Sequence, residues 1–173
     1  NMPQLTKAKN KSKQQEMLIE EALLDNYDHY YRIAYSYVHN ETDAGDIVQE
    51  GAYQAIRHCA SLQKPEYVKT WIYRIMLNEV FLFCRNRKKE TPCAEELSQR
   101  SQLDTYCDID LLNALDQLDA RDKSVIILRY FEEYKLDEIA DILEENISTV
   151  KSRLYRSLKK LRLQLVDDWI WEG

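Results

Sequence analysis

The sequence predicts an all-α protein made of two small helical domains joined by a flexible linker. Three glycines and three prolines among 173 residues leave little turn chemistry for many short strands. Apolar residues instead recur at intervals of three and four along most of the chain, as they do on one face of a helix. Residues 90–108 are polar, weakly periodic and interrupted by Pro92. This stretch is therefore predicted to be the linker.

Residues 16–89 are expected to form the first domain. Helical spacing runs from Glu16 to about Asn40, and resumes in a second helix for which Thr42 is the predicted N-cap. A loop around Pro65 precedes a third helix over residues 68–87, which is so apolar that much of it must be buried. The first 15 residues are polar and rich in lysine, and we expect a disordered N-terminal tail there.

Residues 109–173 are expected to form the second domain. Helices are predicted over residues 111–118, over a segment that follows Asp119, over 136–143 and from Ile147 to about Trp169. Asn146 is a suitable N-cap for the last of these helices.

The composition indicates a protein that folds in the cytoplasm and carries no cofactor. The chain has no run of about eighteen apolar residues, as a membrane span would need. It has no phosphate-binding glycine-rich loop and no HExxH metal motif, and its three histidines are scattered. We therefore expect neither an enzyme nor a metal protein. The cysteines lack CxxC spacing and are expected to be free thiols in a reducing compartment: Cys59, Cys84, Cys93 and Cys107.

One segment stands out against the net charge of −6. VKSRLYRSLKKLR, residues 150–162, carries six basic residues and no acid. Its apolar positions form an inward stripe, and the preceding short helix and turn complete the plan of a helix-turn-helix. The second helix of that motif enters the DNA major groove, where Arg and Lys reach guanine edges. The outward residues predicted to contact DNA are Lys151, Ser152, Tyr155, Arg156, Lys159 and Arg162.

Two segments together resemble a known family. DAGDIVQEGAYQAI (43–56) followed by TWIYRIMLNEV (70–80) resembles the core of sigma domain 2. LDEIADILEENISTVKSRLYRSLKKLR (136–162) resembles the helix-turn-helix of sigma domain 4. Their order and separation are similar to the extracytoplasmic-function (group 4) sigma factors of bacterial RNA polymerase, which keep only these two domains. Within that group the pattern is most similar to sigma-V-like members that respond to envelope stress.

The resemblance implies a sigma factor that binds core RNA polymerase and directs promoter-specific initiation in an envelope-stress regulon. Domain 2, residues 16–89, would dock on the polymerase clamp through Asp43, Asp46, Gln49 and Glu50. The same domain would hold the melted −10 element on aromatic and cationic side chains. The implied −10 residues are Tyr67, Lys69, Trp71, Tyr73, Arg74 and Asn78, with Arg85, Arg87, Lys88 and Lys89 for the backbone.

Domain 4, residues 109–173, would read the −35 element through Lys151, Ser152, Tyr155 and Arg156. Lys159 and Arg162 would lie nearer the phosphates. The implied partners are the clamp of core polymerase, promoter DNA and a cognate anti-sigma factor, which in this group is often membrane-anchored. No small-molecule substrate is implied. The linker would thread toward the polymerase active site and RNA exit.

The chain departs from the family pattern at two positions. Gly45 stands where family members usually have an acid, and Gly in a helix costs about 1 kcal/mol relative to Ala. Glu144 stands where the turn usually has Gly, and a left-handed Glu is strained by about 1 kcal/mol or more.

Two alternatives compete with this interpretation. A helix-turn-helix regulator with a helical sensor or dimerisation domain would explain residues 150–162 equally well. It would not explain the acidic, amide-bearing helix that precedes an aromatic and basic one. On a smaller scale, Trp71 lies at helical spacing among Ile72, Ile75 and Met76, and a Trp in that setting is more often a core residue than a base-stacking platform.

Overall fold

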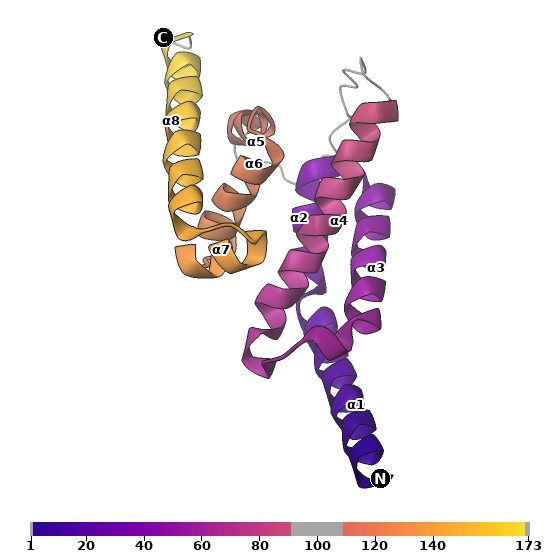
Figure 1. The fold of residues 1–173 in the computed structure, drawn as a ribbon. Helices are drawn as coiled ribbons and strands as arrows, with labels where there is room; N and C mark the ends of the chain where they lie inside the picture. Colours follow the sequence, from indigo (N-terminus) through magenta and orange to yellow (C-terminus); the bar gives the residue numbers. More distant parts are fainter. Residues whose placement is uncertain (1, 91–108, 172–173) are drawn as a thin grey trace. The chain divides into compact units, whose positions relative to one another are not determined.

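The computed structural model describes residues 2–90 and 109–171, and all of the regular structure in them is helical (Figure 1). The chain divides into two compact units, Asn1–Glu95 and Glu96–Gly173. The predicted all-α, two-domain architecture is confirmed. The expected linker lies outside the described residues except for Glu90, and so do Cys93 and Cys107. None of the helices described is long and apolar enough to cross a membrane.

Over residues 2–90 the first unit contains four α-helices. They are α1 (Met2–Asp25), α2 (Tyr27–Val38), α3 (Glu41–Arg57) and α4 (Val68–Glu90), with short 3₁₀ turns η1 (Cys59–Ser61) and η2 (Pro65–Tyr67) between the last two. Helices α2, α3 and α4 pack against one another, and α1 contacts α3, η1 and α4 (Figure 1). The interface holds fully buried apolar side chains, among them Tyr30, Ile33, Ile72, Met76, Leu77 and Val80.

A glycine allows α3 and α4 to approach closely. Gly51 lies on the buried side of α3, and a Cβ atom there would collide with Sδ of Met76 on α4. Met76 is itself 1% exposed, so it has little room to move aside. The contact between these two helices therefore depends on the missing side chain.

The N-terminal segment differs from the sequence-based expectation, because α1 begins at Met2 rather than after a disordered tail. Pro3 suits the first turn of a helix, and no glycine or second proline follows before Asp25. The helix is anchored further along, where Ile19 is fully buried and the Gln15 side chain donates a hydrogen bond to the Leu62 carbonyl. Once one part of a helix is held by packing, each additional residue extends it at little cost.

The start of α3 also differs from the expectation. The helix begins at Glu41, and Asn40 rather than Thr42 caps it, with Asn40 Oδ1 accepting from the Asp43 N–H at 2.9 Å. Asn is at least as good an N-cap as Thr, so the helix starts two residues earlier.

The second unit contains α5 (Ile109–Asp116), α6 (Ala120–Ile126), a π-helical turn η3 (Ile127–Phe131), α7 (Leu136–Leu143) and α8 (Ile147–Trp171). Its apolar cluster joins α5, α6 and α8. The predicted cap of α8 is confirmed, since Asn146 Oδ1 accepts from the Thr149 N–H at 2.8 Å. The cluster consists of Ala114, Leu115, Leu118, Ile126 and Leu161, with Leu111 and Leu154 against it.

Candidate functional site

The outer face of α8 carries all six residues that the sequence predicted for DNA contact. Val150 and Leu161 are buried and hold the helix against the rest of the unit. The opposite face is exposed, and the Tyr155 ring is the most accessible large apolar group on it, at 77%. A row of cations with an aromatic ring suits a groove lined by phosphates and base edges. The exposed residues are Lys151, Ser152, Tyr155, Arg156, Lys159 and Arg162.

Arg156 is exposed yet paired. Its Nη2 lies 2.9 Å from Oδ1 and 3.1 Å from Oδ2 of Asp122, and its Nε lies 3.3 Å from Oδ2. The Asp122 side chain, from α6, is only 2% exposed, whereas the Arg156 side chain is 53% exposed. The guanidinium therefore reaches from a buried carboxylate to the solvent.

Arg153 is a functional candidate that the sequence analysis missed. Its Nη1 donates to Asp122 Oδ1 at 2.8 Å, and its Nε and Nη2 donate to the two oxygens of Glu145 at 2.8 and 3.0 Å. Arg121 also pairs with Glu145, at 3.3 Å. One signal was present in the sequence, because Arg153 follows Val150 by three residues and so lies beside the inward stripe. A charge there needs a buried partner. We call these five residues the Asp122 network: Arg121, Asp122, Glu145, Arg153 and Arg156.

The network favours the ionised forms of Asp122 and Arg153. Burial raises the pKa of Asp122, but the hydrogen bonds and charges of Arg156 and Arg153 outweigh it, so the net pKa lies below the usual value. The hydrogen bonds that Arg153 donates to Glu145 raise the pKa of Arg153, burial opposes this rise, and the hydrogen bond to Asp122 adds to it. The carboxylate between the two guanidinium groups is therefore charged at neutral pH.

The turn before α8 has the left-handed conformation expected for the motif. Glu144 has φ 55° and ψ 38°, and its N–H bonds to carbonyls of Ala140 and Asp141. This is the conformation that glycine adopts most easily. Glu144 therefore adopts the turn conformation that a glycine would adopt, at the cost of strain in its own backbone.

The acidic face of α3 is open to solvent. Asp46, Gln49 and Glu50 are exposed and Asp43 is partly so, while Ala44, Ile47, Val48 and Gly51 face the core. Glu50 accepts a hydrogen bond from Gln54 Nε2 at 2.8 Å. Gly45 stands where family members usually have an acid, and packing does not require a glycine there, since a Cβ would meet nothing within 4 Å.

The aromatic and basic surface around η2 and α4 contains most of the predicted −10 residues. Tyr67 is 51% exposed, with Lys64 Nζ 5.7 Å from its ring centroid, and this cation was not anticipated from the sequence. Arg87 donates to the Val38 carbonyl at 3.5 Å. Among the predicted residues, Lys69, Asn78, Arg85, Arg87, Lys88 and Lys89 are exposed, and Trp71 and Arg74 are partly buried.

Tyr73 does not belong to this surface. It is only 3% exposed and packs edge-on against Tyr30, with ring centroids 4.8 Å apart. Tyr73 lies next to Ile72 and one turn from Met76 and Leu77, so helical geometry turns it toward the core. A ring in that position cannot stack on a base from outside, which removes Tyr73 from the candidate residues.

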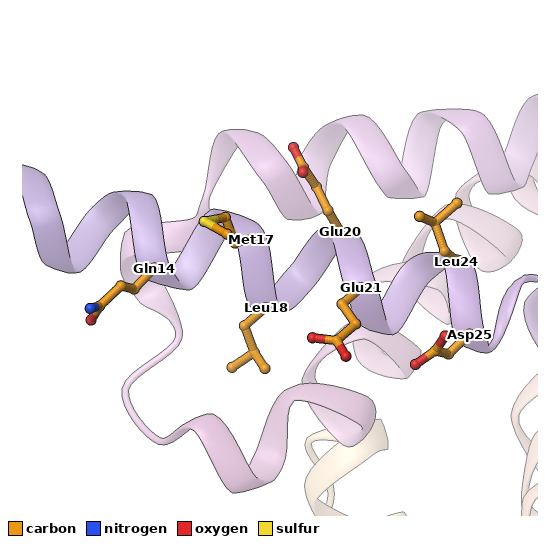
Figure 2. Close-up of a pocket in the computed structure, with 7 residues that line it drawn as sticks. All are labelled: Gln14, Met17, Leu18, Glu20, Glu21, Leu24 and Asp25. Atoms are coloured by element: carbon orange, nitrogen blue, oxygen red, sulfur yellow. The ribbon is translucent and has the colours of Figure 1, made fainter.

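A hollow along α1 offers no comparable chemistry. Its side chains come from one helix and diverge, with Glu20 and Leu24 directed to one side and Leu18, Glu21 and Asp25 to the other (Figure 2). Nowhere in residues 2–90 or 109–171 do three or more His, Cys, Asp or Glu side chains form a cluster that could hold a metal ion.

Both units match family models. The model for sigma-70 region 2 matches residues 23–90, and that for sigma-70 region 4 matches residues 108–161. The RNA polymerase sigma factor SigV of Bacillus subtilis (strain 168) is 42% identical over 154 residues, which cover 87% of this chain and 93% of SigV. The ECF RNA polymerase sigma factor SigW of the same organism is 31% identical over 164 residues, covering 84% and 88% of the two chains.

Solved structures are similar as well. The sigma factor RpoE, crystallised with the anti-sigma factor NepR from Bartonella quintana, is 25% identical with a TM-score of 0.69, covering 84% of this chain and 95% of RpoE. CnrH, in complex with the cytosolic domain of CnrY, has a TM-score of 0.63 at 20% identity, covering 89% and 98%. At that identity CnrH supports the fold alone.

Proposed function

The chain belongs to the extracytoplasmic-function group of the sigma-70 family, and from that premise we propose how its two units divide the work of initiation. Sigma factors are transcription initiation factors and not enzymes. The proposal is that this chain binds core RNA polymerase and directs it to specific promoters. The observation that carries it is the exposed basic face of α8, presented by a helix-turn-helix whose cap and turn are both formed.

The first domain, residues 16–89, is proposed to bind the polymerase clamp and the melted −10 element. The clamp contact would use Asp43, Asp46, Gln49 and Glu50, a set supported by the exposure of the α3 face. The −10 strand would stack on Tyr67 and pass along the cations at the end of α4, because aromatic platforms beside basic groups bind single strands. Trp71 and Arg74 are partly accessible and remain in the proposed set.

The second domain, residues 109–173, is proposed to read the −35 duplex. Lys151, Ser152, Tyr155 and Arg156 would contact base edges, and Lys159 and Arg162 the phosphates. Residues 90–108 would connect the two domains and thread toward the polymerase active site and RNA exit.

A cognate anti-sigma factor is the proposed regulator. RpoE and CnrH were each solved with a partner, which for RpoE is an anti-sigma factor. We propose that this chain is likewise held inactive in the cytoplasm by such a protein, anchored in the membrane. The similarity to SigV supports the further proposal of an envelope-stress regulon. Transcript profiling after envelope damage, in cells with and without this chain, tests the regulon.

The alternative of a helix-turn-helix regulator with a sensor domain is less well supported. It accounts for α8 but leaves the match of residues 23–90 to sigma-70 region 2 unexplained.

The decisive experiment is in vitro transcription with bacterial core polymerase on a pool of genomic promoter fragments. Specific starts that appear only with this chain are expected. Replacing Asp46, Gln49 and Glu50 together by Ala should abolish them and weaken polymerase binding. Arg57→Ala, an exposed change on the same helix, is the matched control and should retain them. If the chain shifts a defined duplex by itself but gives no polymerase-dependent starts, the proposal fails.

A further inference from the structure

The guanidinium group of Arg156 has two edges that can each donate a pair of parallel hydrogen bonds. Asp122 occupies the edge that carries Nε and Nη2, at 3.3 Å and 2.9–3.1 Å. Among the described residues, Nη1 of Arg156 makes no hydrogen bond. The edge that carries Nη1 and Nη2 is therefore open, on a side chain that is half exposed.

That open edge matches one base. Guanine presents two acceptors, O6 and N7, side by side in the major groove, and a bidentate arginine is their commonest partner. Arg156 lies one turn after Ser152 and next to Tyr155, on the face of α8 proposed to enter the groove. Asp122 and a guanine can thus be held by the same guanidinium through different edges.

Asp122 is itself held in a fixed orientation. Its carboxylate is buried and receives a second guanidinium, that of Arg153, at 2.8 Å. Arg153 is in turn held by both oxygens of Glu145. A long arginine side chain ordinarily loses rotamer freedom when it binds, and a partner that orders it beforehand reduces that loss.

Asp122 would keep one guanidinium partner even without Arg156. Arg153 donates to Asp122 at 2.8 Å, while sharing its charge with Glu145 and, at 3.7 Å, with Asp119. The second guanidinium adds a link from the interior of the unit to the DNA-facing surface.

We propose that Asp122 is a positioning residue for −35 recognition, which orients Arg156 so that its free edge reads a guanine. The inference rests on the proposed function and deepens it, since it names a residue on α6 that sets base specificity without touching DNA. It also predicts that the −35 element contains a guanine whose contribution depends on both side chains.

The test uses the full chain, core polymerase and a promoter found in the transcription assay above. Each −35 base pair is substituted in turn, and the fold-loss in initiation is measured for the wild type and for Arg156→Ala. Substituting one particular G·C pair should reduce initiation about tenfold with the wild type and hardly at all with Arg156→Ala. In Asp122→Asn the same base should lose most of its effect, and adding Arg156→Ala should cause little further loss at that base.

Two controls separate positioning from folding. Asp137→Asn removes an exposed carboxylate on α7 that lies outside the Asp122 network, and it should keep the base preference. If Asp122→Asn does not fold, the double change Asp122→Leu with Arg153→Met replaces the buried pair by apolar groups, which are often tolerated. Arg156 then lacks its carboxylate in a folded unit.

The outcomes are distinct. Loss of preference at that one base in the Asp122 variants, with preference kept in Asp137→Asn, supports the inference. Preference kept without Asp122, or no base that depends on Arg156, overturns it while leaving the sigma factor assignment intact. Absence of any polymerase-dependent start with the wild type overturns both.

Discussion

The two units hold α4 and α8, the helices proposed to bind DNA, by different means. In the first unit α4 is held by apolar contacts, with Ile72, Met76 and Val80 almost completely buried. In the second unit α8 rests on a smaller apolar cluster together with buried charges. Among the described residues, every buried polar or charged side chain belongs to the second unit: Asp122, Lys123, Ser124 and Ser157.

This difference separates contacts that mainly stabilise a helix from contacts that orient individual side chains on it. Apolar packing is non-directional and stabilises roughly in proportion to the area removed from water. An ion pair with bidentate geometry adds less net stability, because desolvation offsets it, but it sets direction. The aromatic surface of the first unit needs a firm support, whereas α8 needs individual guanidinium groups held at set angles.

The largest expected effect comes from leaving a buried charge without its partner. Asp122→Ala should destabilise the second unit by about 3–5 kcal/mol, because Arg153 keeps its charge and loses the most buried of its three carboxylate partners, Asp119, Asp122 and Glu145. Hydrogen exchange of the full chain should show α8 amides exposed and α4 amides protected. The double change Asp122→Leu with Arg153→Met should restore most of the protection. An equal loss of amide protection in α4 and α8 would contradict the view that only the second unit depends on buried charges.

Acid should act on the two units in opposite directions. The pKa of Asp122 is lowered in the folded chain, so its contribution is present above the unfolded value of 3.8 and disappears as the pH falls through the folded value. The pKa of Glu79 in the first unit is raised, by burial first and by the charge of Glu50 second. Ionised Glu79 therefore destabilises the first unit at neutral pH, and this penalty fades as the pH falls toward 4.5.

Urea unfolding followed by NMR signals from each unit tests this difference between pH 7 and pH 3. The first unit should gain stability on the way to pH 4.5, and the second should lose it below about pH 4. Glu79→Gln should remove the gain in the first unit. If both units lose stability equally steeply as the pH falls, and Glu79→Gln alters neither loss, then Asp122 and Glu79 do not cause the pH dependence.

A matched pair of glycines tests how closely α3 and α4 pack. Gly51→Ala should destabilise the first unit by about 1–3 kcal/mol, because its Cβ meets the buried Met76 side chain. Gly45→Ala, in the same helix but with open space around it, should stabilise the unit by up to about 1 kcal/mol. Thermal unfolding by circular dichroism compares the two. If both changes stabilise the unit, then helix propensity, rather than the contact with Met76, determines the effect of Gly51→Ala on stability.

The smallest effect concerns the turn before α8. Glu144→Gly should stabilise the second unit by about 1 kcal/mol or less, since glycine adopts the left-handed conformation without strain. Lys160→Gly, at an exposed helical position of α8, should cost about 1 kcal/mol instead. The two midpoints of urea unfolding should therefore move in opposite directions. A loss of stability in Glu144→Gly would mean that the Glu side chain compensates for the strain.

The sequence by itself determined the helices and the faces that they present. Periodicity of three and four residues predicted the all-α fold, and the same spacing separated the exposed cations of α8 from Val150 and Leu161. The cap at Asn146 could be predicted because its partner, Thr149, is three residues away. These features are local, so neighbouring residues contain the information that defines them.

Only the tertiary structure decided which polar and aromatic groups are buried and what they contact. Tyr73 was a candidate for base stacking until α2 brought Tyr30 against it, 43 residues away along the chain. Asp122 meets Arg153 and Arg156 across separations of 31 and 34 residues, and no periodic pattern connects positions so far apart. Such pairs form only when apolar packing brings α6 and α8 together, and for that reason the support of Arg156 could not be predicted from its own helix.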